Sequence, residues 1–207
     1  MPFNLECRLC PRLATFLDQV KADYPAYHAR PVAPFGASDA QLLIVGLAPG
    51  MHGANATGRP FTGDHAGILL YETLHRFGFS SAPESRAVDD GLTLHNCRIT
   101  NAVKCLPPQN KPVGAEINAC NDFLREELQM LAGNSVILAL GSIAHRAVVK
   151  ACDGRQKDYL FGHAAEHQLP NGLRLLDSYH CSRYNTQTKR LTTKMFQDVF
   201  ARARDLL

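Results

Sequence analysis

Four short apolar runs divide the chain, and each has the length and composition of a buried strand. The clearest are QLLIVGL at 41–47 and SVILALG at 135–141, where nearly every position is apolar and turn residues follow the first run. Two further strands are expected at 97–103 and 173–179. Apolar character that continues without alternation indicates strands covered on both faces, as in a parallel sheet.

Between these runs, apolar residues recur at helical spacing. One helix is expected to follow the N-cap residue Asp64, and others are expected at 115–131, 142–152 and 192–207. Strands that alternate with helices predict an α/β fold with three α/β/α layers around a central, mainly parallel four-stranded sheet. We expect residues 1–207 to form a single domain.

Polar or glycine-rich segments follow all four predicted strands. They span residues 48–64, 101–104, 141–145 and 180–185. Ligands of open parallel sheets bind outside the carboxyl ends of the strands. The sequence therefore predicts one shared site at that edge of the sheet.

Composition and charge narrow the class of protein only slightly. The chain has 22 basic and 19 acidic residues, a net charge of +3, which permits nucleic-acid binding without requiring it. No apolar run approaches the roughly 20 residues of a membrane helix, and no secretion signal is evident. We expect a cytoplasmic monomer without membrane contact.

Seven cysteines in such a chain argue against a disulfide framework, because the number is odd and the cytoplasm is reducing. Cys7 and Cys10 form a C-x2-C pair, and Cys105 and Cys120 lie 15 positions apart. Four thiolates suit a structural zinc ion or a [4Fe–4S] cluster, and the spacing alone does not separate the two. Free thiols in the core are the other interpretation.

The segment GLAPGMHGANATGRPFTGD at 46–64 contains five glycines and two prolines directly after a strand. Such a loop can bring backbone N–H groups close to an anionic ligand. It matches neither G-x-x-x-x-G-K-[ST] nor G-x-G-x-x-G, so a standard nucleotide-binding motif is not indicated.

This loop resembles the first motif of the uracil-DNA glycosylase superfamily, and within it the type B, or family five, enzymes. The resemblance continues in ITNAVKCLPP at 99–108, LGSIAH at 140–145 and SYHCSRYNTQTKRLT at 178–192. Leu47 stands where family four members have a glutamate, which favours family five.

The resemblance implies a monofunctional DNA-repair glycosylase that flips uracil out of DNA and hydrolyses its N-glycosidic bond, leaving an abasic site. Related deaminated bases such as hypoxanthine and xanthine belong to the implied range. Cys7, Cys10, Cys105 and Cys120 match the positions of the family's [4Fe–4S] ligands, which favours an iron–sulfur cluster over zinc.

Four residues are expected to carry the chemistry. The resemblance implies that Phe61 stacks on the flipped base and that His180 hydrogen-bonds a base oxygen, as a neutral or a charged donor. The Asn101 amide can donate to and accept from the edge of uracil. Asp64 is our candidate for the carboxylate that positions water or stabilises the positively charged sugar. Its competing role is the N-cap of the following helix.

Ala48 marks a departure from other branches of the superfamily, which place a polar, water-activating residue in this region. His52 and Asn55 are further polar candidates for that role. Together with Gly46 and Ala48, they are expected at the substrate-binding site.

The polar loop SRYNTQTKR is expected to enter or line the minor groove of DNA. Arg183 and Lys189 would lie near phosphates, while Ser182 and Asn185 could hydrogen-bond the DNA backbone. A short charged loop of this kind can also be an ordinary solvated surface.

Two other functions fit parts of the pattern. An iron–sulfur protein could recognise a modified base in DNA without excising it. A small-molecule nucleotide hydrolase could use the glycine-rich loop, but the phosphate-binding lysine of such enzymes is missing.

Overall fold

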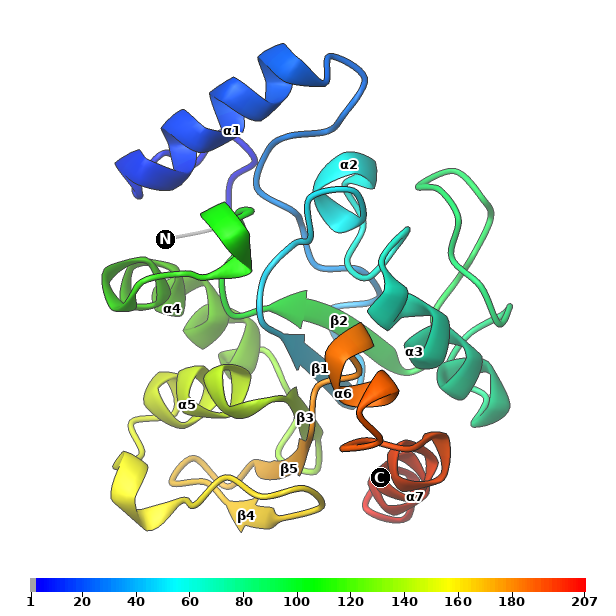
Figure 1. Cartoon of the computed structure of the whole chain (residues 1–207). Helices are drawn as coiled ribbons and strands as arrows, with labels where there is room; N and C mark the ends of the chain where they lie inside the picture. The colour runs from blue at the N-terminus through cyan, green and yellow to red at the C-terminus, as the bar shows by residue number, and fades with distance from the viewer. Residues whose placement is uncertain (1–2) are drawn as a thin grey trace.

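The computed structural model describes residues 3–207 and has a mainly parallel sheet at its centre. The strands lie in the order β2 (Cys97–Asn101), β1 (Leu42–Gly46), β3 (Val136–Leu140), β5 (Arg174–Ser178) and β4 (Glu166–Gln168). The first four strands in this order are parallel to one another, and β4 pairs with β5 in the antiparallel direction. Figure 1 shows this arrangement.

The four predicted strands are confirmed, but the expected number of strands was too small. The fifth strand, β4, has only three residues, Glu-His-Gln, and lies at the edge of the sheet with two of them exposed. A short polar edge strand has no apolar run by which the sequence could reveal it.

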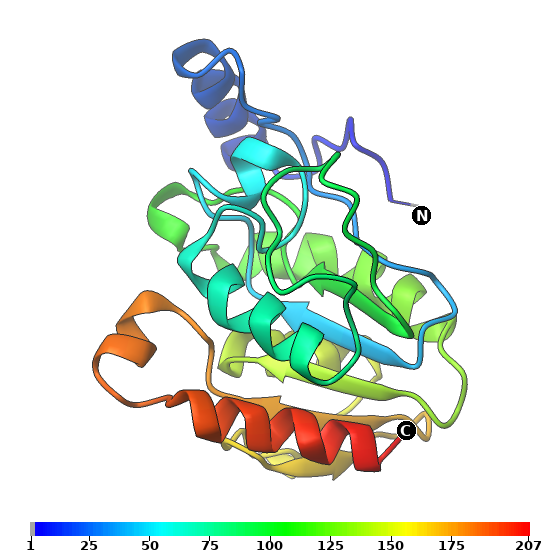
Figure 2. The same ribbon diagram turned by 90° about the vertical axis from the view of Figure 1, so that its right-hand side faces the viewer.

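Helices cover both faces of the sheet, as predicted for three layers (Figure 2). In β1, Leu42 and Ile44 pack in a core with α3 (His65–Arg76) and α7 (Thr193–Asp205), whereas Leu43 and Val45 pack in a second core with α4 (Gly114–Gln129) and α5 (Ser142–Ala151). The helical segments are α1 (Pro11–Asp23), α2 (Ala54–Thr57), α3 (His65–Arg76), η1 (Pro108–Asn110), α4 (Gly114–Gln129), α5 (Ser142–Ala151), η2 (Gln156–Asp158), α6 (Arg183–Gln187) and α7 (Thr193–Asp205). None within residues 3–207 is long and apolar enough to span a bilayer.

Helix α1 was not predicted, although its sequence has the required signals. Pro11 stands at its first turn, where a missing N–H is tolerated. Leu13, Leu17 and Val20 share one face and pack in a third core with Phe123 of α4. This core attaches the amino-terminal segment beside the end of β2.

A buried ion pair joins the segment after β2 to helix α4. The Lys104 Nζ lies 2.5 Å from a carboxylate oxygen of Glu127, and the two side chains are only 1% and 6% exposed. Lys104 also donates a hydrogen bond to the Thr100 hydroxyl. Because both charges are out of water, each depends on the other.

We predict that Glu127→Ala lowers the free energy of unfolding by about 3–5 kcal/mol, because it leaves a buried ammonium group without its counter-charge. The double variant Lys104→Met/Glu127→Leu should recover most of that loss, since it removes both charges and keeps the volume. Urea unfolding followed by circular dichroism measures both. A single variant as stable as the wild type would contradict the prediction.

Candidate active site

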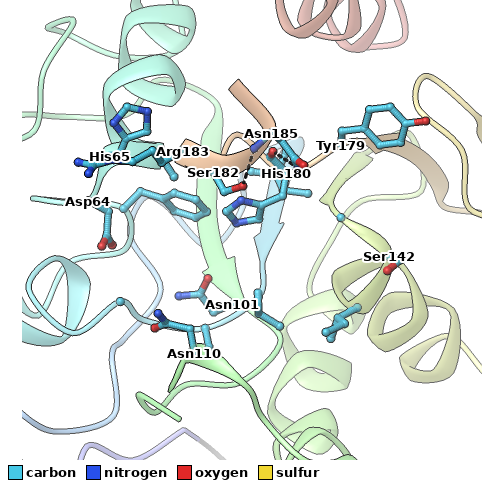
Figure 3. Close-up of a pocket in the computed structure, with 18 of the residues that line it drawn as sticks. Asp64, His65, Asn101, Asn110, Ser142, Tyr179, His180, Ser182, Arg183 and Asn185 are labelled. Carbon is cyan, nitrogen blue, oxygen red and sulfur yellow. Dashed lines mark hydrogen bonds between the residues drawn. The ribbon is translucent and has the colours of Figure 1, made fainter. Parts of the chain in front are cut away.

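One cavity of about 510 Å³ opens at the carboxyl edge of the parallel strands. Its wall takes residues from the segments after β1, β3 and β5, together with Asn101 at the end of β2. These are the four polar segments that the strand pattern places at one edge. Figure 3 shows Asp64, Asn101 and His180 around the same space.

Phe61 presents its ring to this cavity from an uncommon backbone conformation. Its φ is +57°, in the left-handed region that non-glycine residues rarely occupy. The side chain is 6% exposed, and its ring lies 6.1 Å from the ring of His180 with a small interplanar angle of 26°. The two nearly parallel rings form an apolar, flat part of the wall.

Asn101 lies beside Gly46, its partner in the register of β1 and β2. A Cβ atom on Gly46 would lie 2.4 Å from Asn101 Oδ1 and 2.7 Å from Phe61 Cζ. Gly46 therefore does not line the cavity itself but leaves room for two residues that do. Asn101 is 4% exposed, so its amide faces the cavity with little competing water.

Asp64 occupies the N-cap position of α3, but its side chain does not cap that helix. Its Oδ2 instead accepts a hydrogen bond of 3.1 Å from the N–H of Ala54, the first residue of α2. The expectation that Asp64 could be occupied in capping α3 is therefore wrong, because its carboxylate bonds to the start of α2 instead. Burial raises the Asp64 pKa, and the N–H groups of Ala54 and Gly50 oppose that shift in part.

His180 follows β5 and is held without charge. Burial lowers its pKa to about 4, so the ring is neutral at neutral pH. Its Nδ1 is buried and has no hydrogen-bond partner within residues 3–207. The backbone carbonyl of His180 accepts from the Asn185 side chain at 2.8 Å, which fixes the chain beside α6. Of the two forms expected for this donor, the structure favours the neutral one.

His52 and Asn55 do not reach the cavity, whereas Ala48 lines it. The His52 Nδ1 lies 2.8 Å from the Tyr27 hydroxyl. Asn55 is fully buried, with neither polar side-chain atom bonded to the part of the chain that the structure describes. His52 lies just before α2 and Asn55 lies within it, so this short helix interrupts the loop where both were expected. The sequence contains no strong signal for a helix of four residues.

The polar segment after β5 is helical in part, since α6 begins at Arg183. Ser182 caps this helix, because its hydroxyl accepts from the Asn185 N–H. Ser182, Arg183 and Asn185 line the cavity, but Lys189 does not. Lys189 is exposed on the same segment, with a left-handed φ of +57°.

Several cavity residues escaped the sequence analysis as site residues. Tyr179 precedes His180 in a predicted strand, so its position could have been found from the His180 motif. Phe161 has no such signal, because it lies in an irregular segment between η2 and β4. The others lie next to or within recognised segments and are Leu47, Gly50, His65, Ala66, Asn110, Leu140, Gly141, Ser142, Ile143 and Arg190.

The four candidate metal ligands come together at the third core, away from the cavity. Cys7 and Cys10 precede α1, Cys105 follows β2, and Cys120 lies in α4, and all four surround one small pocket. Burial, with the nearby cysteines, raises the pKa of Cys10 to about 11. Thiolates this close would repel one another, so the ionised set requires a cation between them.

The spacing of these sulfurs can be compared with that of zinc ligands. A tetrahedral zinc site with Zn–S bonds of about 2.3 Å places its sulfurs about 3.8 Å apart. Among residues 3–207, the group of three potential ligand atoms lying within 4.8 Å of one another is His145, His167 and Asp177, not a group of cysteines.

Comparison with known proteins agrees with the motifs. The model of the "Uracil DNA glycosylase superfamily" matches residues 33–204. The type-5 uracil-DNA glycosylase of Thermus thermophilus is 47% identical over 205 residues, which cover 97% of this chain and 93% of that protein. The corresponding protein of Mycobacterium leprae is 42% identical, with 97% and 91% covered.

Similarity to type-4 enzymes is lower and shorter. The type-4 uracil-DNA glycosylase of Archaeoglobus fulgidus is 31% identical over 150 residues, covering 72% of this chain and 61% of that protein. The chain thus belongs to the uracil DNA glycosylase superfamily, and within it to the type-5 family.

Proposed function

We propose that this protein is a uracil-DNA glycosylase, a DNA-repair enzyme that hydrolyses the N-glycosidic bond of uracil in DNA and leaves an abasic site. The observation that carries the proposal is the meeting of Phe61, Asp64, Asn101 and His180 on one cavity at the strand ends. An aromatic ring, an amide, a neutral imidazole and a carboxylate are the groups that base recognition and glycosidic cleavage require.

Base flipping accounts for the position of these groups. A uracil stacked inside a duplex cannot enter a cavity in the protein, so the nucleotide has to rotate out of the helix. The Phe61 ring would then stack on the base, and the Asn101 amide would pair with the adjacent carbonyl and imide of its edge. Xanthine carries the same imide edge, and hypoxanthine has a carbonyl next to an N–H, so we include both bases in the proposed range.

Cleavage of the bond places negative charge on the departing base and positive charge on the sugar. Neutral His180 can donate a hydrogen bond to a base oxygen, and in a site with little water such a donor has a large effect. The Asp64 carboxylate would stabilise the sugar cation and position the attacking water. Because Ala48 offers no polar group and neither His52 nor Asn55 lines the cavity, we assign this role to Asp64.

The segment after His180 would bind the DNA strand. Ser182, Arg183 and Asn185 lie at the cavity, and Lys189 is exposed nearby. We propose that these four residues contact the DNA backbone from the minor-groove side. We further propose that the enzyme is a cytoplasmic monomer. Its binding to DNA would associate it with the nucleoid.

We also propose that Cys7, Cys10, Cys105 and Cys120 hold a [4Fe–4S] cluster rather than a zinc ion. Supporting this are the convergence of the four sulfurs on one small pocket and the mutual repulsion of their thiolates, together with the family resemblance of their positions. The cluster would serve as a structural cross-link that ties the start of α1 to the segment after β2 and to α4.

Excision tests the proposed activity. Purified protein is incubated with labelled duplexes containing uracil or hypoxanthine, and abasic sites are cleaved with alkali. We expect the wild type to yield abasic sites, and Asp64→Asn and Asn101→Ala each to lower the rate about 100- to 1,000-fold. Asp64→Asn keeps an oxygen that can accept from the Ala54 N–H, so the loop should be preserved.

Asp153→Asn is the matched control for removal of a carboxylate. Asp153 is exposed and paired with Arg125 at 2.7 Å, so excision should be unchanged. Tight binding of the lesion by the wild type without base release would support the alternative, a DNA-binding protein that recognises a modified base.

The pH dependence of excision follows from Asp64. Burial raises its pKa above the ordinary value of about 3.9, and only the ionised carboxylate can stabilise the sugar cation. We predict that the single-turnover rate falls about tenfold per pH unit as the pH drops through that raised pKa. This fall in rate at low pH should vanish in Asp64→Asn, whose residual rate would depend less on pH. An identical fall in the variant would assign it to another group.

Removal of one cysteine tests the cluster. Cys10→Ser is expected to lower bound iron and the free energy of unfolding together, because three thiolates hold a [4Fe–4S] cluster poorly. Iron is measured by a ferrozine assay and stability by urea unfolding, with Cys152→Ser, outside the cysteine group, as the control for iron. Full stability of a wild-type protein without metal would refute the proposal, and stoichiometric zinc in place of iron would support the alternative.

A further inference from the structure

Two arginines at the cavity lack the acidic partners that most other arginines have. Within residues 3–207, eight arginine side chains lie within 4.0 Å of a carboxylate oxygen, with N–O distances of 2.5 to 2.8 Å. Arg183 and Arg190 line the cavity, and neither takes part in any of the ion pairs formed among residues 3–207. Their charge is therefore available to an anionic ligand.

Arg190 is held in place by an aromatic side chain. The centre of its guanidinium group lies 4.7 Å from the ring centroid of Tyr179. The Tyr179 ring also stacks on His163 at 5.0 Å, and the Tyr179 N–H donates to the His163 Nδ1. A cation over a fixed ring loses less side-chain freedom when it binds a ligand than an unsupported one.

The backbone around Arg190 is fixed as well. The preceding residue, Lys189, has a left-handed φ of +57°, which turns the chain sharply. The following residue, Leu191, is 1% exposed, and its N–H donates to the Asn185 carbonyl at 3.0 Å. Arg190 is thus an exposed cation between a turn and a buried anchor, directed to the cavity wall.

The two arginines border different ends of the cavity. Figure 3 shows Arg183 beside Asp64 and His65, whereas Tyr179 lies beyond His180 on the other side. Arg190 belongs to the Tyr179 end because it covers that ring. Asn101 and His180 lie between the Arg183 end and the Tyr179 end of the cavity in this view.

We propose that Arg190 binds the phosphodiester on one side of the flipped nucleotide, while Arg183 faces the phosphodiester on the other side. The inference rests on the proposed glycosylase function. A guanidinium group donates two parallel hydrogen bonds to phosphate oxygens, and both donors here are free of carboxylate competition. Tyr179 acts through Arg190 as a positioning residue.

The inference gives Arg190 a role that Lys189 does not share. The two residues are adjacent, basic and exposed, but only Arg190 lines the cavity and packs against an aromatic ring. Contact with a phosphate next to the flipped nucleotide would align the sugar with Asp64. Loss of that contact should therefore affect substrate use beyond general attraction to DNA.

The test combines protein and DNA changes. Single-turnover excision is measured for wild type and Arg190→Gln on uracil duplexes whose 5′ or 3′ linkage at the lesion is an ordinary phosphodiester or an uncharged methylphosphonate. Arg190→Gln should lower kcat/KM about tenfold on the ordinary duplex. At one of the two linkages, the methylphosphonate should lower kcat/KM of the wild type by a similar factor. At that same linkage it should not lower kcat/KM of Arg190→Gln any further. The salt dependence of binding should lose about 0.9 in its logarithmic slope.

Arg204→Gln removes an equal charge at the carboxyl end of α7. This end of the helix and α6 lie at opposite ends of the strands (Figure 2). The substitution should leave excision unchanged. Tyr179→Phe should keep kcat/KM because the ring remains, and Tyr179→Leu should reproduce part of the Arg190→Gln loss. That partial loss should likewise disappear on the methylphosphonate duplex.

Two results would overturn the inference. One is no loss in Arg190→Gln, and the other is an equal loss on all duplexes, which would show that no single phosphate is involved. Both presuppose that the wild type releases uracil from the ordinary duplex. A wild type without that activity would instead refute the proposed function.

Discussion

The site depends on a close approach of backbone to functional side chains in the loop after β1. A Cβ atom on Gly53 would lie 2.0 Å from the carboxylate carbon of Asp64, and one on Gly46 would overlap Asn101 and Phe61. No side chain fits at either position. The absence of these two side chains lets the loop fold back on itself, so that a carboxylate, an amide and an aromatic ring share one cavity.

This close packing also sets the electrostatics of the site. Enclosure by backbone removes water from Asp64, which raises its pKa, while the amide N–H groups keep the carboxylate in one orientation. Burial also keeps His180 neutral. Beyond the carboxyl end of β2, the segment after Asn101 continues through buried Lys104 to Cys105. Only the three residues 102–104 thus separate the base-reading Asn101 from the proposed cluster ligand Cys105.

The sequence predicted the features that depend on local pattern. Apolar runs gave the four long strands, and the position of polar segments after them gave the shared site. It failed where tertiary contacts decide the result. Asp64 follows the sequence rule for a cap of α3, yet it bonds to α2, because the glycines bring that helix to it. Arg190 looked like any basic surface residue, and only the fold places it over Tyr179.

The central claim is that one flipped base is held by these groups together. A crystal structure of the Asp64→Asn variant with a uracil-containing duplex tests it most directly. The account predicts an extrahelical uracil in the cavity, with its face on Phe61 and its edge within hydrogen-bond distance of Asn101 and His180. A uracil still stacked in the duplex, or one bound away from Asn101, would contradict the account.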